Sequence, residues 1–150
     1  MKSILFICFS FLLVLGVQAQ EEVKTFTDIE KAKKHAAENN QDILMVFAGS
    51  DWCKPCIQFK KDVLQSNDFV DRLEDKLSIL YLDFPARRKN KLSKEQTAHN
   101  EALAERFNKS GAFPKIVLLD RQEKVLGSPA FKGQTALDFV HELESALTAK

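Results

Sequence analysis

The sequence has few of the features that build membrane spans, disulfide scaffolds or strongly charged surfaces. Its longest apolar run, residues 4–17, is shorter than the roughly 20 residues that cross a bilayer. It has three cysteines, no internal repeat and no low-complexity stretch, and its 22 basic and 21 acidic residues almost cancel. These absences argue against a transmembrane anchor, a disulfide-stapled domain, and bulk attraction to nucleic acid or to a membrane.

The N-terminus has the layout of a secretory signal peptide over residues 1–19. Lys2 supplies the positive charge, the apolar run follows, and Val17-Gln18-Ala19 ends in the small residues of a cleavage site. We expect cleavage there to remove Cys8 and to leave residues 20–150 as one domain, with no stable membrane insertion. Because the chain carries no C-terminal endoplasmic reticulum retention signal, we expect it in a bacterial periplasm.

Hydrophobic periodicity and capping boxes at 27–30 and 93–96 predict an α/β fold. We expect helices at about 27–39, 53–65, 68–74, 93–111 and 135–147, and strands at 43–47, 77–84, 115–120 and 124–126. Strands that alternate with helices predict parallel pairing and helices on both faces of the sheet. The last two strands, joined by a tight turn, predict an antiparallel edge.

The reactive residues are Cys53 and Cys56, which lie where a buried strand ends and a helix begins. A helix N-terminus stabilises the thiolate form of a cysteine, and Lys54 adds a neighbouring cation. Pro55 fits the first helical turn because no N–H group is needed there. The loop between the two cysteines is too small to stabilise a fold much. We therefore expect a redox pair in which Cys53 is the exposed nucleophile and Cys56 is the resolving thiol.

The segment Trp52-Cys53-Lys54-Pro55-Cys56, placed after a strand, resembles the active site of the thioredoxin-like family, and of its exported disulfide reductases in particular. Phe113-Pro114 lies where members of that family carry a cis proline beside the nucleophile. The resemblance implies a thioredoxin fold, with a central mixed β-sheet flanked by helices on both faces. It also implies substrate-binding roles for Trp52, Phe113 and Pro114.

Two positions depart from the family pattern. Many thioredoxins bury an acidic residue in the strand before the motif, where this chain has Phe47. Asp51 is nearer to the cysteines, but we expect it to be too exposed to replace that acid. Lys54 stands where many family members have glycine. Both departures bear on the redox potential of the pair and therefore on the direction of the reaction.

These observations predict a protein-disulfide reductase that acts on disulfide-bearing exported proteins and receives electrons from an upstream thiol donor, such as a membrane-embedded carrier. We expect no cofactor beyond the Cys53–Cys56 disulfide. We also expect no metal, because structural zinc needs four ligands and His35, His99 and His141 lie on three different predicted helices. A disulfide oxidase or isomerase, and a non-catalytic chaperone or assembly factor, are the alternatives. The basic segment 87–91 is expected to be a solvated loop or, alternatively, a docking site for an acidic partner.

Overall fold

The computed structural model describes residues 23–149, so the predicted signal peptide lies outside the described residues. The elements run β1 (Thr25–Phe26), α1 (Ile29–Glu38), β2 (Asp42–Ala48), α2 (Lys54–Phe59), the π-helical turn η1 (Lys60–Leu64), α3 (Asn67–Leu73), β3 (Leu77–Asp83), the 3₁₀ turn η2 (Arg88–Asn90), α4 (Lys94–Phe107), β4 (Lys115–Leu119), β5 (Val125–Gly127) and α5 (Ala136–Thr148). No helix within this part of the chain is long and apolar enough to cross a membrane.

The five strands form one mixed sheet in the order β1-β3-β2-β4-β5, which confirms the predicted mixed α/β architecture. β1, which the sequence did not predict, pairs with β3, and β3 pairs with β2, both in parallel. The expected parallel pairing of the third predicted strand, β4, is wrong, because β4 runs antiparallel to β2. Asp83 pairs with Ala48, and Lys115 pairs with Phe47. The connection from β3 to β4 therefore leaves and re-enters the sheet at one end, which reverses the strand direction.

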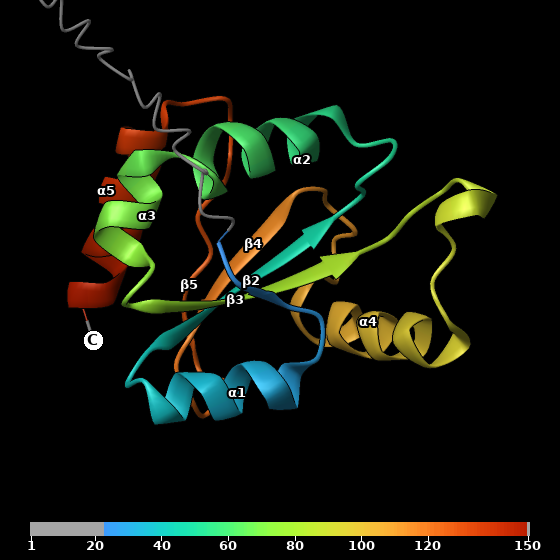
Figure 1. Ribbon diagram of the computed structural model, residues 1–150, viewed down its shortest axis with the longest axis horizontal. Helices are drawn as coiled ribbons and strands as arrows, with labels where there is room; N and C mark the ends of the chain where they lie inside the picture. The colour runs from blue at the N-terminus through green and yellow to red at the C-terminus, as the bar shows by residue number, and fades with distance from the viewer. Residues whose placement is uncertain (1–22, 150) are drawn as a thin grey trace, which may run out of the picture.

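Helices cover both faces of the sheet, as predicted (Figure 1). The side chains of β2 alternate between the two layers, as expected for a strand that is buried on both faces. Leu44, Val46 and Ala48 join the core beneath α2, α3 and α5, whereas Ile43, Met45 and Phe47 join the core against α1 and α4. All six residues are at most 1% exposed, so β2 ends at the site as a firmly packed strand.

Side-chain caps set the helix starts, with one correction to the predicted capping boxes. Ser93 caps α4 as predicted, through a 3.1 Å hydrogen bond from the Gln96 N–H. In α1 the cap is Asp28, and not Thr27, because the Asp28 carboxylate accepts the Lys31 N–H at 2.9 Å. The predicted helix 93–111 ends earlier, at Phe107, because the chain then turns toward the active site.

Candidate active site

The two cysteines lie at the start of α2 and form a disulfide. Cys53 is the N-cap of α2, and its sulfur accepts a hydrogen bond from the Cys56 N–H at 3.2 Å. The Cys56 N–H, which also donates to the Cys53 carbonyl at 3.0 Å, thus lies within hydrogen-bond distance of the sulfur at the helix N-terminus, and this is the local feature that stabilises a thiolate. The expectation that Cys53 is exposed is wrong. It is 4% exposed and Cys56 is 1% exposed, because both belong to the core against which Phe113 packs.

Trp52 is the exposed residue of the motif, with 48% of its surface accessible. Its indole Nε1–H donates a 2.7 Å hydrogen bond to the carbonyl oxygen of Phe84, just after β3. The ring also meets Phe113 edge-on, with 5.3 Å between the ring centroids. Trp52 is therefore held at its polar end and along its edge while it offers the rest of its surface to solvent beside Cys53.

Gly49 is needed for this placement of Trp52, and the sequence did not mark it as a site residue. A Cβ at Gly49 would lie 2.3 Å from Cε2 and 2.5 Å from Nε1 of the indole. Any larger side chain would therefore displace the ring. The available signal was a glycine directly after a buried strand, which also fits an ordinary turn.

An aromatic row extends from Trp52 into the core. Ring centroids are 5.4 Å apart for Phe113 and Phe84 and 6.3 Å apart for Phe84 and Phe47. Phe47 stands where many thioredoxins have a buried acid, and it is fully buried on the α1 and α4 side of the sheet. Phe47 is thus a packing residue at the base of this row. Cys56 belongs to the core on the opposite face of the sheet.

The loop before the cysteines is held by hydrogen bonds to the segment after β3. Ser50 donates to the Asp83 carboxylate through its N–H at 2.8 Å and through its hydroxyl at 2.7 Å. Asp51 accepts from the N–H groups of Ala86 at 2.9 Å and Arg87 at 3.0 Å, and from Asn90 Nδ2 at 2.8 Å.

These contacts lower the pKa of the Asp51 carboxyl, with the Ala86 N–H as the largest cause. Asp51 is thus engaged in holding the loop.

The peptide bond between Phe113 and Pro114 is cis. Pro114 directly precedes Lys115, which pairs with Phe47 at the active-site end of the sheet. Asn108 shapes the approach to this bond, because its amide donates to the Ala112 carbonyl at 2.9 Å and accepts the Ala112 N–H at 3.1 Å. The asparagine is 5% exposed, and no feature of the sequence distinguished this role from an ordinary helix end.

The predicted modulators Lys54 and Pro55 lie on a different helix from His35 and from His99. Lys54 and Pro55 are exposed in the first turn of α2. His35 is 3.0 Å from the Ser78 hydroxyl, and His99 accepts the Ile29 N–H at 3.3 Å. Within residues 23–149, no three His, Cys, Asp or Glu side chains gather into a group that could hold a metal ion.

A cysteine pair at the start of the second helix, together with a cis proline directly before an antiparallel strand at the same end of the sheet, is typical of a thioredoxin fold. The family model of the thioredoxin-like domain matches residues 29–144, and the chain belongs to that family. It is a thiol–disulfide oxidoreductase with its disulfide between Cys53 and Cys56.

The relatives and solved structures that the chain resembles include the following four. It is 32% identical to the disulfide bond reductase DsbH of Chlamydia pneumoniae over 117 residues, which are 78% of this chain and 69% of DsbH. It is 30% identical to the thioredoxin-related protein DsbJ of that organism over 97 residues, 65% of this chain but 27% of DsbJ. The structure of a DsbH oxidoreductase superposes with a TM-score of 0.77 at 28% identity, covering 88% and 89% of the two chains. A thioredoxin from Thermus thermophilus superposes at 0.64 with 15% identity, covering 85% and 88%, which shows the fold alone.

Proposed function

We propose that this protein reduces disulfides of exported proteins, with Cys53 as the nucleophile and Cys56 as the resolving thiol. The observation that carries the proposal is the position of Cys53 as the N-cap of α2, where its sulfur accepts the Cys56 N–H. The same N–H stabilises the thiolate when the pair is reduced. The near-complete burial of the pair beside an exposed Trp52 suits a site at which a bound polypeptide docks on the indole and covers the cysteines.

The reaction proceeds by two thiol–disulfide exchanges. The Cys53 thiolate attacks one sulfur of the substrate disulfide, so that a mixed disulfide forms and the first substrate thiol leaves. Cys56 then loses its proton and attacks the Cys53 sulfur, which breaks the mixed disulfide and releases the second thiol. Two electrons pass to the substrate and the Cys53–Cys56 disulfide remains. A dithiol donor restores the pair by the same steps, with two electrons and two protons.

Three further points belong to the proposal. The signal-peptide layout of residues 1–19 supports export to a bacterial periplasm. In that oxidising compartment the pair needs a dedicated dithiol donor, such as a membrane-embedded carrier. The likeness to a protein named as a disulfide bond reductase supports the reducing direction.

Two cysteine variants test the roles in an insulin-reduction assay with dithiothreitol as the donor. We expect Cys53→Ser to lose turnover completely, because the thiol that remains, Cys56, is the less accessible of the pair, at 1% exposed, and cannot replace the nucleophile. Cys56→Ser is expected to form mixed disulfides that persist and that appear on a non-reducing gel. Turnover that survives in Cys53→Ser would reject the assignment, and an inactive wild type would favour the chaperone alternative.

The direction is tested by the equilibrium reduction potential of the pair, titrated against glutathione or dithiothreitol. A reductase should lie near the thioredoxin value of about −270 mV, whereas oxidants and isomerases lie at about −120 to −180 mV. A value in the second range would reverse the proposed direction and leave the cysteine roles intact.

A further inference from the structure

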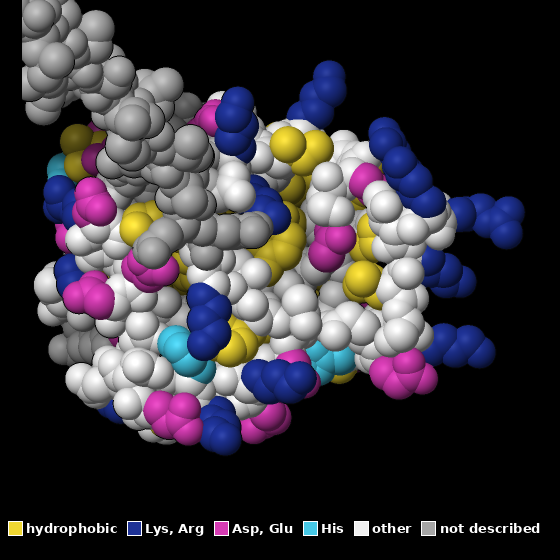
Figure 2. All heavy atoms as spheres, in the orientation of Figure 1, with side chains coloured by type: hydrophobic (Ala, Val, Ile, Leu, Met, Phe, Trp, Pro, Cys, Tyr) yellow, Lys and Arg dark blue, Asp and Glu magenta, His cyan; other side chains and the backbone are white. Residues whose placement is uncertain are grey.

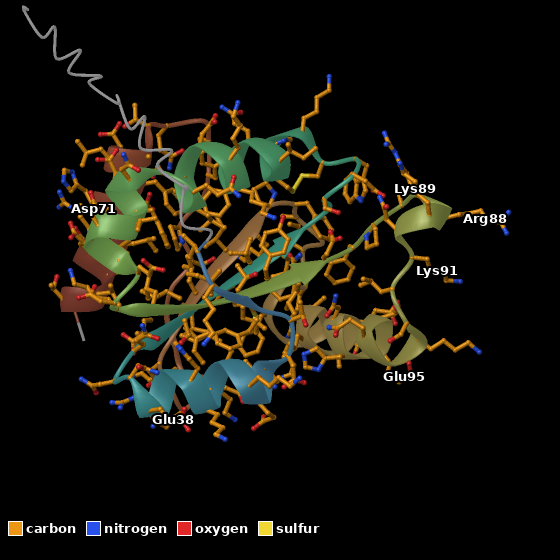
Figure 3. All side chains as sticks on the ribbon, in the orientation of Figure 1. Glu38, Asp71, Arg88, Lys89, Lys91 and Glu95 are labelled. Carbon is orange, nitrogen blue, oxygen red and sulfur yellow. A yellow bond between two sulfur atoms is a disulfide. The ribbon has the colours of Figure 1, made fainter. Side chains whose placement is uncertain are left out.

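A basic segment projects from the molecule at the active-site end of the sheet. Arg or Lys occupies most positions from Arg87 to Lys94, and no acidic residue interrupts them. Residues 87–91 are all exposed, and Arg88, Lys89 and Lys91 point away from the body of the protein (Figure 3). Lys and Arg side chains gather along that edge of the surface (Figure 2). Among the described residues, no ion pair engages these three cations.

The basic segment is fixed relative to the redox pair. The Asp51 carboxylate holds the N–H groups of Ala86 and Arg87 and the side chain of Asn90, all within 3.0 Å. Asp51 is separated from Cys53 by Trp52 alone, and Trp52 is itself bonded to the carbonyl of Phe84. The charges are therefore presented by a turn that is anchored to the active-site loop, so that little ordering is needed when a partner binds.

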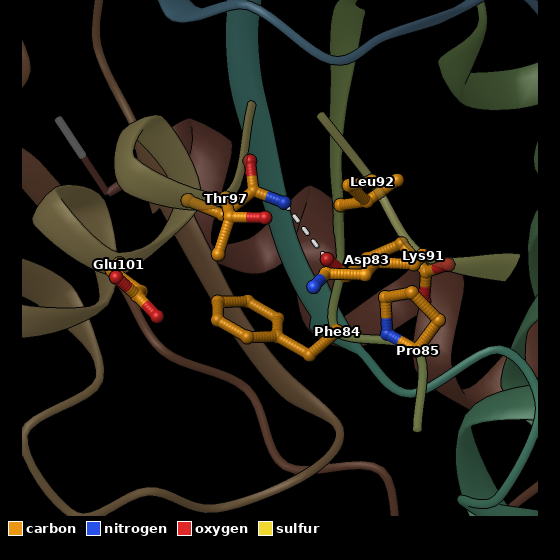
Figure 4. A pocket seen from close by; sticks show the side chains of 8 residues that line it. Asp83, Phe84, Pro85, Lys91, Leu92, Thr97 and Glu101 are labelled. Atoms are coloured by element: carbon orange, nitrogen blue, oxygen red, sulfur yellow. Dashed lines mark hydrogen bonds between the residues drawn. The ribbon is translucent and has the colours of Figure 1, made fainter. Parts of the chain in front are cut away.

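A cavity of about 250 Å³ lies between this segment and α4 (Figure 4). Phe84, Pro85 and Leu92 provide its apolar wall, and Thr97, Asn100 and Glu101 of α4 close the other side. This volume falls below the roughly 300–1,000 Å³ of small-molecule sites, so it suits one side chain of a bound polypeptide. Because Glu101 and Asp83 line the cavity together with this apolar wall, an acidic side chain is disfavoured there, and the wall suits an apolar one.

We propose that the segment Arg87–Lys91, together with the cavity behind it, docks an acidic stretch of the substrate polypeptide beside the disulfide that is reduced. This inference rests on the proposed function and names its substrate class. The protein has a formal net charge of only +1, so a preference for acidic substrates must come from local charges. The nearby carboxylates of Asp51 and Asp83 are turned toward the loops, from which they accept hydrogen bonds, whereas Arg88, Lys89 and Lys91 of the turn point away from the protein toward a partner.

Glu95 and Glu101 are two further acidic groups near the basic segment. Glu95 lies in the first turn of α4, where its own backbone N–H and then the Ser93 hydroxyl lower the pKa of its carboxyl, and Figure 3 shows it below Lys91. Glu101 lines the cavity on the α4 side. The acidic stretch of the substrate is therefore expected to follow Arg88 and Lys89 at the tip of the turn, with an apolar side chain in the cavity.

The test compares two disulfide peptides that share one cysteine-containing core and differ only in flanking residues, acidic in one and neutral in the other. The first variant combines Arg88→Glu, Lys89→Glu and Lys91→Glu. The matched control combines Lys34→Glu, Arg121→Glu and Lys124→Glu. The control residues are exposed, lie on α1 and in the β4–β5 turn, and impose the same change of net charge. Reduction rates are followed at low salt and at about 0.5 M NaCl, where charge–charge attraction is largely screened.

We expect wild type to reduce the acidic peptide at least about tenfold faster, in kcat/KM at low salt, than the neutral one. The reversal variant should lose this preference and still reduce the neutral peptide at the wild-type rate. The control variant should keep the preference, and high salt should abolish it throughout. A neutral variant, Arg88→Gln with Lys89→Gln and Lys91→Gln, should fall between wild type and the reversal variant.

Distinct outcomes separate the docking proposal from the proposed function. Equal rates for the two peptides with wild type, or an equal loss in the control variant, would overturn the docking proposal alone. Failure of wild type to reduce either peptide would overturn the proposed function. If only binding to phosphatidylglycerol vesicles depended on the three cations, the segment would be a lipid-binding surface and the docking proposal would be wrong.

Discussion

At each end of the sheet an aspartate carboxylate accepts backbone N–H groups, but the donors lie at very different distances along the chain. At the active-site end, the Asp51 carboxylate accepts N–H groups from residues 35 and 36 positions along the chain. At the other end, the Asp120 carboxylate accepts the N–H groups of Gln122 and Lys124, which are two and four positions away. A local turn therefore closes one end, whereas the active-site end is closed by bonds between distant segments. The position of the redox pair depends on the whole fold.

The two ends also differ in whether their charged side chains are paired within the fold. Glu123, at the end away from the active site, pairs with Lys33 at 2.8 Å and with Arg106. No such pair holds Arg88 or Lys89 among residues 23–149. Cations that are matched within the fold support stability, whereas cations left facing solvent beside a reactive site remain available to a partner.

Phe47→Asp is expected to have the largest effect, which is a loss of stability at the active-site end. This change places a carboxylate in the apolar core between the sheet and α1 and removes the base of the aromatic row. We expect the free energy of unfolding to fall by at least about 3 kcal/mol in urea titrations. Phe47→Leu is the control and should cost less than about 1.5 kcal/mol. A stable Phe47→Asp protein with faster insulin reduction would show that the position can serve as the family's buried acid.

Gly49→Ala is expected to act mainly on activity. The added methyl group would lie 2.3 Å from the indole, so Trp52 must leave its place and lose its bond to Phe84. We expect a stability loss of about 1–3 kcal/mol, a shift in tryptophan emission and about tenfold slower insulin reduction. Gly127→Ala is the matched control, because a Cβ there would meet only Ala146, at an ordinary 3.5 Å. An unchanged emission spectrum in Gly49→Ala would contradict the inferred role of the glycine.

The difference between the two ends also explains what could be predicted from the sequence. The order of most elements, the cysteine pair and the cap at Ser93 follow from patterns within a few residues. The roles of Gly49 and Asp83, and the direction of β4, depend on which distant segments meet, and one sequence carries no pattern for such contacts. The burial of Cys53 also depends on a distant segment. Phe113, which packs against the core that contains Cys53, comes after α4 in the chain.

Asp51→Asn tests the long-range closure through its pH dependence. Hydrogen bonds led by the Ala86 N–H lower the pKa of the folded carboxyl below its unfolded value, so the ionised group stabilises the fold above that unfolded value. We expect a lower thermal midpoint than wild type at pH 7, with the gap closing as the pH falls below about 4. The variant should also lose part of its preference for acidic peptides, because the basic turn is freed. Asp120→Asn should keep that preference, and a loss there would remove the distinction between the two ends.

Glu123→Gln is expected to have the smallest effect, and it probes the matched charges of the end away from the active site. Hydrogen bonds from Lys33 and then Arg106 lower the pKa of the Glu123 carboxyl, so its stabilising contribution is present near neutral pH and is lost as the pH falls through the folded pKa. Solvent screening keeps that contribution to about 0.5–1 kcal/mol, measurable as a shift in the urea midpoint at pH 7 that disappears in acid. Insulin reduction and the preference between peptides should match wild type. A change in either would mean that charge pairing at one end of the sheet is coupled to the redox site at the other.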